Sequence, residues 1–559
     1  MKNAYNMKRS YREIHVTTLM KLYEYSTETY WDRPLSQYVD GSESYTYGSF
    51  KQKCDLISQR LSRFGISAGD KVGILSQNMP NWAVAFFSLT AFGRVAIPIL
   101  PDASENEVSN ILTHSDSKAI FISKNQLSKL SPEIQDRLTL IIDIETFGFI
   151  KKDDNAFQCD GWVKDPQADD LATIIYTSGT TGHAKGVMLS HRNLCHNIIE
   201  AFKAHKCSRR DRFLSILPLA HTYEMSIACL YPIFVGASVY YLKKPPTPSV
   251  LMSAMKKIRP NVMCSVPLII EKVYRNSVLP TIRNSRILSW LEKSWPWLLY
   301  RLVGGRLYKS FGGRLHFFGI GGSKLDSTVE EFLIKCRFPY AIGYGLTETA
   351  PLVCNAMVGK TKVGSIGIAS YGVEVRLADI NPETGEGEIQ VRGQNVMLGY
   401  YRDPERTIGV IDEDGWFRTN DIATVDKDGY YFIKGRLNNT ILGASGENIY
   451  PEEIEMVIND FEGVNESLVM EREGKLVALV KFDDNVLDWD QAAEDKFFEN
   501  LQARKTAVLE YVNKKVGKNS KINEVEAMKE PFEKTATQKI RRFKYKDYHS
   551  EEPKNPQEE

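Results

Sequence analysis

The sequence predicts an α/β protein with a large N-terminal region of parallel sheets, a β-barrel-like subdomain and a small C-terminal α+β domain. Up to residue 242, short apolar runs alternate with helical patterns, which is typical of parallel sheets covered by helices. From about residue 364, glycines separate short runs of alternating polarity, which is typical of antiparallel strands. We therefore expect an N-terminal domain over 1–435 (α/β layers to about 363, β-rich from about 364 to 435), a C-terminal domain over 436–549 and a disordered tail over 550–559.

The first elements are expected to be helices at both ends of residues 14–66, around a short strand at 43–47. The second helix has apolar residues at the spacing of an amphipathic helix: Phe50, Cys54, Leu56 and Leu61. Apolar, partly β-branched runs then predict strands at 70–75, 94–98, 119–123, 171–176, 213–217 and 238–242. The patterns between the first of these strands predict helices at 82–92 and 105–114. After residue 435, a small α/β unit is expected from three segments, 450–461, 476–482 and 489–516.

Composition limits the class of protein. The 559 residues are 43% hydrophobic and 25% charged, which are ordinary globular values. The formal net charge of +1 gives no global basic field that would indicate nucleic acid as a partner. Eight cysteines without a Cys-x-x-Cys pair, and an N-terminus without an apolar signal segment, indicate reduced thiols and a cytoplasmic protein. Peripheral contact with the inner membrane surface is compatible with this composition.

The most informative stretch is 176–187, with the sequence YTSGTTGHAKGV, directly after an apolar strand. Its glycines allow backbone N–H groups to converge on an anion, and its hydroxyl groups and Lys185 add donors and a positive charge. These features indicate a loop that binds polyphosphate. It is not a P-loop of the Walker A type, because Lys185 is followed by Gly186 and does not begin a helix.

The motif GYGLTET at 343–349 carries groups for nucleotide chemistry after an expected strand. Tyr344 can stack on a base, Thr347 can contact a phosphate, and Glu348 can hold Mg²⁺ together with phosphate oxygens. By itself the motif is also compatible with a turn that exposes a solvated glutamate. The loop upstream favours the nucleotide interpretation.

Two neighbouring segments, WFRTND at 416–421 and DGYYFIKGR at 428–436, supply a carboxylate and a guanidinium group. Asp421 can accept hydrogen bonds from both hydroxyl groups of a ribose, and Arg436 can supply charge to the sugar or a phosphate. Two motifs follow downstream, GASGENIYPEEIE at 443–455 and PFEKTATQKIRR at 531–542. By itself the last motif would be interpreted as a basic solvated tail or a patch for acidic lipid.

In this order and spacing, the motifs resemble those of the adenylate-forming superfamily of acyl-CoA synthetases, luciferases and peptide-synthetase adenylation domains. The segments 217–224 and 265–274, and an insert that runs to 312–325, are most similar to bacterial long-chain fatty acyl-CoA synthetases. The resemblance implies ATP-dependent activation of a long-chain fatty acid through acyl-AMP, then transfer to coenzyme A with release of AMP and pyrophosphate. It also implies Mg²⁺ as a cofactor and a C-terminal domain that is mobile.

The resemblance assigns roles to individual residues. The implied catalytic residues are His221, Thr347, Glu348 and Lys539, with Glu348 holding the metal. The implied ATP-binding residues are Thr177, Ser178, Gly179, Thr180, Thr181, Gly182, Lys185, Gly322, Ser323, Tyr344, Gly345, Thr347, Asp421 and Arg436. Asn438 is the implied hinge, and the implied coenzyme A tunnel is formed by Gly443, Ser445, Gly446 and Glu447. Three positions depart from the family pattern, namely Asn420, Asn438 and Gln538.

Two other functions are compatible with these residues. One is a related ligase that uses a carrier protein or an aryl acid, and the other is a non-catalytic nucleotide-binding protein, which the three departures would suit. The insert also allows two interpretations, since it mixes aromatic and basic residues: Trp290, Lys293, Trp295, Trp297, Tyr300, Arg301 and Arg306. It is either an amphipathic surface that contacts lipid or a helical hairpin that packs on its own protein.

Overall fold

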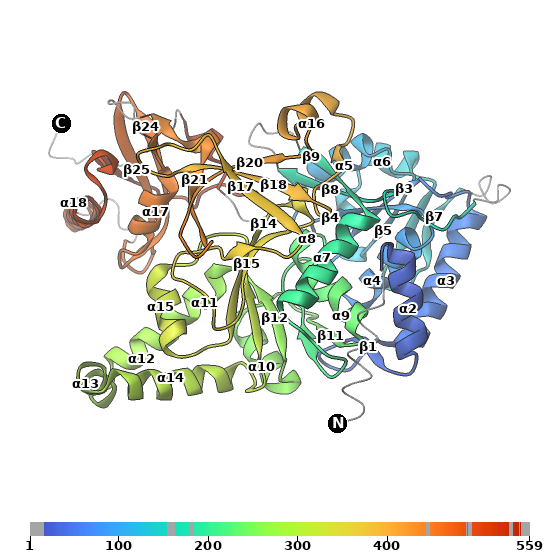
Figure 1. The fold of residues 1–559 in the computed structure, drawn as a ribbon, viewed down its shortest axis with the longest axis horizontal. Coiled ribbons are helices and arrows are strands. Elements are labelled where there is room, and N and C mark those ends of the chain that lie inside the picture. Colours follow the sequence, from blue (N-terminus) through green and yellow to red (C-terminus); the bar gives the residue numbers. More distant parts are fainter. Residues whose placement is uncertain are drawn as a thin grey trace.

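The computed structural model describes residues 16–153, 162–178, 184–442, 448–487, 489, 495–535, 540–546 and 548, and of residues 178, 184, 495 and 496 the backbone alone. Figure 1 shows two large sheets with helices around them, and a smaller unit formed by the C-terminal part of the chain at the upper left. The expected α/β class is confirmed: parallel sheets, a separate antiparallel sheet and a C-terminal α+β unit are all present.

The first large sheet has eight strands in the order β19-β9-β8-β4-β3-β5-β6-β7, and its five central strands are parallel. These strands are β3 (Lys71–Leu75), β4 (Val95–Ile99), β5 (Ala119–Ile122), β6 (Leu140–Asp143), β7 (Phe149–Lys152), β8 (Leu171–Ser178), β9 (Ala184–Ser190) and β19 (Gly399–Tyr400). The central strands are buried on both faces, because helices cover both. Their continuous apolar runs follow from that burial.

The second large sheet has nine strands in the order β16-β15-β14-β13-β12-β10-β11-β1-β2. They are β1 (Pro34–Tyr38), β2 (Ser44–Thr46), β10 (Arg212–Leu214), β11 (Ser238–Tyr241), β12 (Val262–Ser265), β13 (Phe317–Ile320), β14 (Tyr340–Gly345), β15 (Leu352–Ala356) and β16 (Ile368–Ala369). Strands β10 to β14 and β1 run parallel, so the carboxyl ends of β13 and β14 meet at one edge of the sheet. Ligands of open α/β sheets bind at such an edge.

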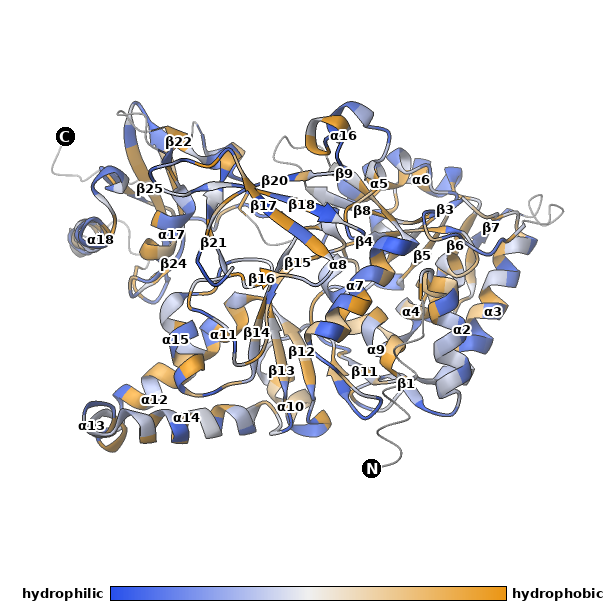
Figure 2. Cartoon of the chain, in the orientation of Figure 1, coloured by the Kyte–Doolittle hydropathy of each residue, from blue (hydrophilic) through white to orange (hydrophobic). Residues whose placement is uncertain are grey.

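The helices of the N-terminal region lie around these sheets, and most of them turn an apolar face inward, as the colours of Figure 2 show. They are α2 (Leu19–Tyr30), α3 (Tyr47–Arg63), α4 (Pro80–Thr90), α5 (Glu105–His114), α6 (Pro132–Arg137), α7 (His191–Ala204), α8 (Thr222–Glu224), α9 (Tyr231–Val235), α10 (Pro248–Ile258), α11 (Pro267–Val273), α12 (Leu279–Arg283), α13 (Arg286–Ser294), α14 (Pro296–Ser310), α15 (Ser327–Lys335) and α16 (Pro404–Val410). Shorter helical turns are η1 (Lys124–Lys129), η3 (Met225–Leu230), η4 (Tyr274–Val278) and η5 (Thr347–Thr349). No helix in the described part of the chain is long and apolar enough to cross a membrane.

Two sequence-based expectations for the N-terminal segment need correction. Strand β1 was not predicted, because its alternation is short and begins at a proline. Leu56 was expected on the buried face of α3 but is 48% exposed, whereas Ile57 is buried. An α-helix turns 100° per residue, so the buried stripe passes through Phe50, Cys54, Ile57 and Leu61.

A four-stranded antiparallel sheet follows the two large sheets in the chain, in the order β17-β18-β20-β21. Its strands are β17 (Val373–Ala378), β18 (Gly387–Gly393), β20 (Phe417–Val425) and β21 (Tyr431–Arg436). Its buried face packs on β15 through Val353 and Cys354. This contact brings the ends of β20 and β21 to the edge of the nine-stranded sheet, next to Tyr344.

The C-terminal unit has its own hydrophobic core around a three-stranded sheet in the order β24-β25-β26. Its elements are η6 (Leu437–Asn439), β22 (Ile441–Leu442), β23 (Asn448–Ile449), α17 (Pro451–Asn459), β24 (Val464–Arg472), β25 (Lys475–Phe482), α18 (Asp495–Lys515), η8 (Lys518–Ser520), β26 (Glu524–Ala527) and η9 (Arg542–Tyr545). The predicted tail, residues 550–559, lies outside the described residues.

Candidate active site

Asp421 is the centre of a buried polar cluster at the edge of the nine-stranded sheet. It lies opposite Arg436 in the β20–β21 ladder, and Arg436 Nε is 3.0 Å from Asp421 Oδ1. The hydroxyl group of Tyr344, at the end of β14, donates to Asp421 Oδ2 at 2.6 Å. The charge of Asp421 raises the pKa of Arg436, and burial followed by the same charge raises the pKa of Tyr344. Each carboxylate oxygen thus accepts from one partner and keeps a second lone pair that can accept from a ribose hydroxyl group.

Asn420 departs from the family pattern but fits the backbone that it occupies. Its φ of 59° lies in the left-handed region, which glycine and asparagine tolerate better than other residues. Its N–H group donates to Glu388 Oε1 at 3.0 Å. The next N–H group, that of Asp421, donates to Thr419 Oγ1 at 3.1 Å. Asparagine therefore keeps the turn that presents Asp421.

Lys185 and Glu348 face each other across Tyr400. The hydroxyl group of Tyr400 donates to Glu348 Oε1 at 3.0 Å, and Lys185 Nζ is 5.3 Å from the centre of the Tyr400 ring. Burial lowers the pKa of Lys185, and the charge of Glu348 partly offsets this shift. Sequence reasoning missed Tyr400, because its role depends on β19 pairing with β9.

The expected phosphate loop joins two strands and not a strand and a helix. Strands β8 and β9 pair antiparallel, with Thr177 opposite Lys185. Lys185 therefore lies on a strand, and it does not begin a helix, as the sequence indicated. Residues Gly179, Thr180, Thr181 and Gly182 lie outside the described residues, as does the side chain of Ser178.

Two glycines at the same sheet edge cannot be replaced without a change in the backbone. Gly322, after β13, has a φ of +92°, and it is followed by the exposed Ser323. A Cβ atom on Gly345 would lie 1.7 Å from the carbonyl oxygen of Pro351. Gly345 lies two residues before η5, which contains Thr347 and Glu348. The parallel strands β13 and β14 thus bring these predicted nucleotide contacts together.

An apolar cavity of about 70 Å³ lies beside this edge, between α7 and strands β12 to β15. Small residues line much of it: Ala201, Ala204, Gly319, Ala341, Gly343 and Ala356. His221 is two residues from Tyr223, which lines the cavity. The Nδ1 atom of His221 accepts a hydrogen bond from the backbone N–H group of Tyr223 at 3.3 Å. Both Gly343 on β14 and Phe317 on β13 line the cavity, and the parallel pairing of these strands places Gly343 four residues further along the sheet than Phe317. Because a strand rises about 3.3 Å per residue, the cavity extends roughly 13 Å from the nucleotide edge.

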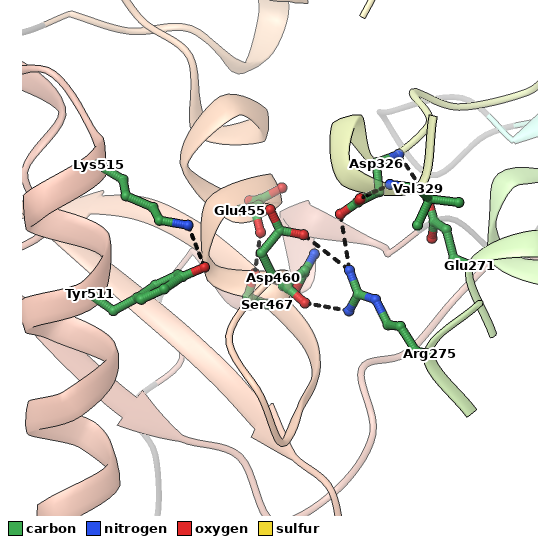
Figure 3. A network of polar contacts seen from close by, with 10 residues as sticks. Glu271, Arg275, Asp326, Val329, Glu455, Asp460, Ser467, Tyr511 and Lys515 are labelled. Atoms are coloured by element: carbon green, nitrogen blue, oxygen red, sulfur yellow. Dashed lines mark hydrogen bonds and ion pairs between the residues drawn. The ribbon is translucent and has the colours of Figure 1, made fainter. Parts of the chain in front are cut away.

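The C-terminal unit contacts the rest of the chain through Arg275, as Figure 3 shows. Arg275 Nη2 is 3.1 Å from Asp326 Oδ2 and 3.1 Å from Asp460 Oδ1, and Nη1 donates to the carbonyl group of Asn459 at 2.6 Å. A second contact joins Arg541 Nη2 to Glu107 Oε1 at 3.0 Å, at the start of α5. The expected tunnel residues Gly443, Ser445, Gly446 and Glu447, and the expected catalytic Lys539, lie outside the described residues.

The Arg275 contact predicts a pH-dependent position of the C-terminal unit. Burial, and then the nearby Asp326, raise the pKa of Asp460 to about 7, against the opposing charges of Arg275 and Lys515. The docked form therefore binds a proton, and docking weakens as the pH rises through about 7. The pKa of Asp326 is lowered, so the charge of Asp326 does not change near neutral pH and adds nothing to the pH dependence of docking.

We expect Asp460→Asn, which mimics the protonated group, to remove this dependence. Small-angle scattering at pH 6 and pH 8 checks the prediction: the wild-type radius of gyration should rise with pH, and that of the variant should stay constant. Asp484→Asn, a largely exposed carboxylate of the same unit, is the matched control and should behave as the wild type. The same rise in Asp460→Asn would contradict the prediction.

Comparison with known proteins places the chain in a family. The AMP-binding enzyme family matches residues 24–401. The chain is 28% identical to the peroxisomal long chain acyl-CoA synthetase 7 of Arabidopsis thaliana, over 98% of this chain and 89% of that protein. It is also 28% identical to the chloroplastic long-chain-fatty-acid–acyl-carrier-protein ligase AEE15 of the same organism, over 77% of this chain and 71% of that protein.

Among solved structures, ATP-bound MatB from Rhodopseudomonas palustris is similar to the chain in fold. The TM-score is 0.75 at 24% sequence identity, with 94% of this chain and 99% of MatB covered. Because the family match spans more than half of the sequence, the chain belongs to the AMP-binding enzyme family.

Proposed function

We propose that the chain is an AMP-forming long-chain fatty acid–CoA ligase. The observation that carries this proposal is the apolar cavity, which begins at Gly343, next to Tyr344 of the polar cluster. The first methylene groups of a fatty acid can lie in the cavity with the carboxylate at the nucleotide edge, and a longer chain requires this cavity of about 70 Å³ to widen, because ligand pockets typically measure roughly 300–1,000 Å³. Gly319 and Gly343 keep the wall of the cavity free of side chains, as an alkyl chain requires.

In the first step, a carboxylate oxygen of the acid attacks the α-phosphorus of ATP. The new O–P bond forms while the bond to the bridging oxygen of the β-phosphate breaks, and pyrophosphate leaves with the electron pair. Lys185 and Lys539 supply positive charge for the phosphate oxygens, and Asp421 and Arg436 hold the ribose. Preorganised charges of this kind stabilise the transition state.

Glu348 fits the Mg²⁺ ion that such a reaction uses. Mg²⁺ takes one or two carboxylates and completes its shell with phosphate oxygens and water. The described residues contain no group of three or more His, Cys, Asp or Glu side chains that could form a metal site without substrate. Glu348 Oε1 accepts a hydrogen bond from Tyr400, which fixes the orientation of the carboxylate. When bound, Mg²⁺ neutralises charge on the phosphate oxygens.

In the second step, the thiolate of coenzyme A attacks the carbonyl carbon of acyl-AMP. The C–S bond forms, the bond to the AMP oxygen breaks, and AMP leaves. We propose that the N-terminal domain ends at residue 435, and that residues 436–549 rotate about Asn438 between the two steps. Asn438 lies in η6, directly after β21. This rotation withdraws Lys539 and presents the tunnel residues at 443–447.

We further propose that His205 limits the length of the acyl chain. Its ring lines the cavity at the end remote from Gly343 and lies 4.7 Å from the Phe317 ring, centre to centre. His205 Nε2 is 2.8 Å from His316 Nδ1, and His316 Nε2 is 3.1 Å from Asp211 Oδ1. Because a carboxylate only accepts, His316 donates to Asp211, and His205 donates to His316. Burial, and then His316, lower the pKa of His205 to about 4, so the ring is neutral.

We expect His205→Ala to extend the preference of the enzyme toward longer acids. Each further methylene group buried in the vacated space contributes about 0.8 kcal/mol, so the ratio of kcat/KM for acids that differ by one carbon rises about fourfold. A series of saturated acids measures this ratio. His196→Ala, a half-buried histidine of α7 outside the cavity, is the matched control. An unchanged chain-length profile in His205→Ala would refute the role of His205.

Two alternatives remain distinct from this proposal, and one experiment separates them. The relative that loads an acyl-carrier protein supports a ligase with another acceptor. The departures at Asn420, Asn438 and Gln538 would suit a non-catalytic protein. Pyrophosphate release is measured with fatty and aryl acids, with and without coenzyme A. Fatty-acid-dependent release and formation of acyl-CoA support the proposal; turnover unaffected by coenzyme A supports another acceptor, and no release with any acid supports the non-catalytic alternative.

A further inference from the structure

Helices α13 and α14 and the residue that joins them carry three tryptophans that the fold does not bury. Trp290, Trp295 and Trp297 are 57%, 53% and 65% exposed, and the rings of Trp290 and Trp295 are 6.2 Å apart, centre to centre. Two aliphatic side chains on the same helices are also exposed, Ile287 and Leu302. We call these five residues the tryptophan patch. Figure 1 shows the two helices along the lower edge of the molecule.

The opposite face of these helices is packed on the protein. Leu291, Leu299, Val303 and Leu307 are buried in the core that covers the nine-stranded sheet. The helices are therefore held in position without the tryptophan patch. One face of the insert therefore packs on its own protein, and the other face is exposed.

The segment that carries the tryptophan patch is also rich in basic residues. Residues 281–310 contain six exposed basic residues, namely Arg283, Arg286, Lys293, Arg301, Arg306 and Lys309, and one acidic residue, Glu292. Among the described residues only Arg283 of these six has an ion-pair partner, Glu462 at 3.8 Å. The other five charges are available to an external partner. This local excess contrasts with the net charge of +1 of the whole chain.

We propose that the tryptophan patch and its basic residues bind the surface of an anionic lipid bilayer. Tryptophan side chains are stable at the level of the lipid headgroups, and aliphatic side chains gain from contact with the acyl chains. Lysine and arginine residues gain electrostatic energy near anionic lipid. A symmetric contact between two copies would bring like charges together, and a nucleic acid would leave Ile287 and Leu302 without an apolar partner.

The test uses the full chain without ATP, acid or coenzyme A, so its result does not depend on the proposed function. Binding is measured by co-sedimentation with vesicles of phosphatidylcholine alone and of phosphatidylcholine mixed with phosphatidylglycerol. Tryptophan quenching by brominated acyl chains reports insertion. The variants are the triple substitution of Trp290, Trp295 and Trp297 by serine, and the pair Arg301→Glu and Arg306→Glu. Trp162→Ser is the matched control, because Trp162 is 58% exposed elsewhere on the surface.

We expect the wild type and Trp162→Ser to bind the phosphatidylglycerol vesicles with quenching. The triple variant should bind roughly tenfold more weakly, and the arginine pair should lose the preference for anionic lipid. Unchanged binding by the triple variant, or no binding by the wild type, would overturn the proposal. Wild-type dimerisation that the triple variant loses, or displacement of the vesicles by RNA with no quenching, would assign the patch to another partner and equally overturn it.

Discussion

Replacing Lys539 with alanine is expected to slow acyl-adenylate formation by about 10²–10³-fold, the usual cost of removing one charged contact to a transition state. The second half-reaction, measured with supplied acyl-AMP and coenzyme A, should keep nearly its wild-type rate. Arg541, two residues after Lys539 in the sequence, contacts Glu107 at the start of α5 in the N-terminal region.

Lys546→Ala is the matched control for Lys539→Ala. Lys546 is an exposed lysine of the same basic segment, and its removal should leave both half-reactions unchanged. Equal losses in the two half-reactions of Lys539→Ala would contradict the rotation about Asn438, because Lys539 would then serve both steps from one position. Thermal unfolding of each variant separates loss of the side chain from loss of the fold.

The sequence could predict the alternation of strands and helices because burial on both faces leaves continuous apolar runs. It could not predict which face of α3 is buried near Leu56. Leu56 and the next residue, Ile57, are both apolar, and only the packing of the helix shows that Ile57 is the buried one. It also could not predict β1. The parallel neighbour of β1 is β11, which is far away in the sequence, and its antiparallel neighbour β2 follows only after a turn.

For the candidate site, individual motifs identified Glu348, Asp421 and Arg436, but not what each of them contacts. The hydrogen bond from Tyr400 to Glu348 joins residues 52 positions apart, and no local pattern marks Tyr400. Asn420 looked like a departure that weakened the site, yet its left-handed backbone explains why asparagine is tolerated. The histidines at the end of the cavity were missed because α7 and the segment before β13 meet only in the fold.

Replacing Glu348 with glutamine is expected to lower kcat for adenylation by about 10²–10³-fold and to weaken the dependence on Mg²⁺. The amide oxygen can still accept the hydrogen bond from Tyr400, so the fold around η5 should persist. Loss of the carboxylate also removes the charge that offsets the burial of Lys185, and the pKa of Lys185 should therefore fall further. The alkaline limb of the rate profile should move to lower pH in this variant.

The informative comparison for Glu348→Gln is Tyr400→Phe, which removes the hydrogen bond and keeps the carboxylate. Losing that bond costs about 1 kcal/mol or somewhat more, because the acceptor is charged, so Tyr400→Phe should lose roughly tenfold in rate and keep its response to Mg²⁺. Thermal shift by ATP with and without Mg²⁺ gives a readout that does not depend on turnover. The additional shift caused by Mg²⁺ should vanish in Glu348→Gln alone. If Glu348→Gln kept that shift, the metal would be held without Glu348, and the carboxylate would serve only to orient Tyr400 and to sustain the charge of Lys185.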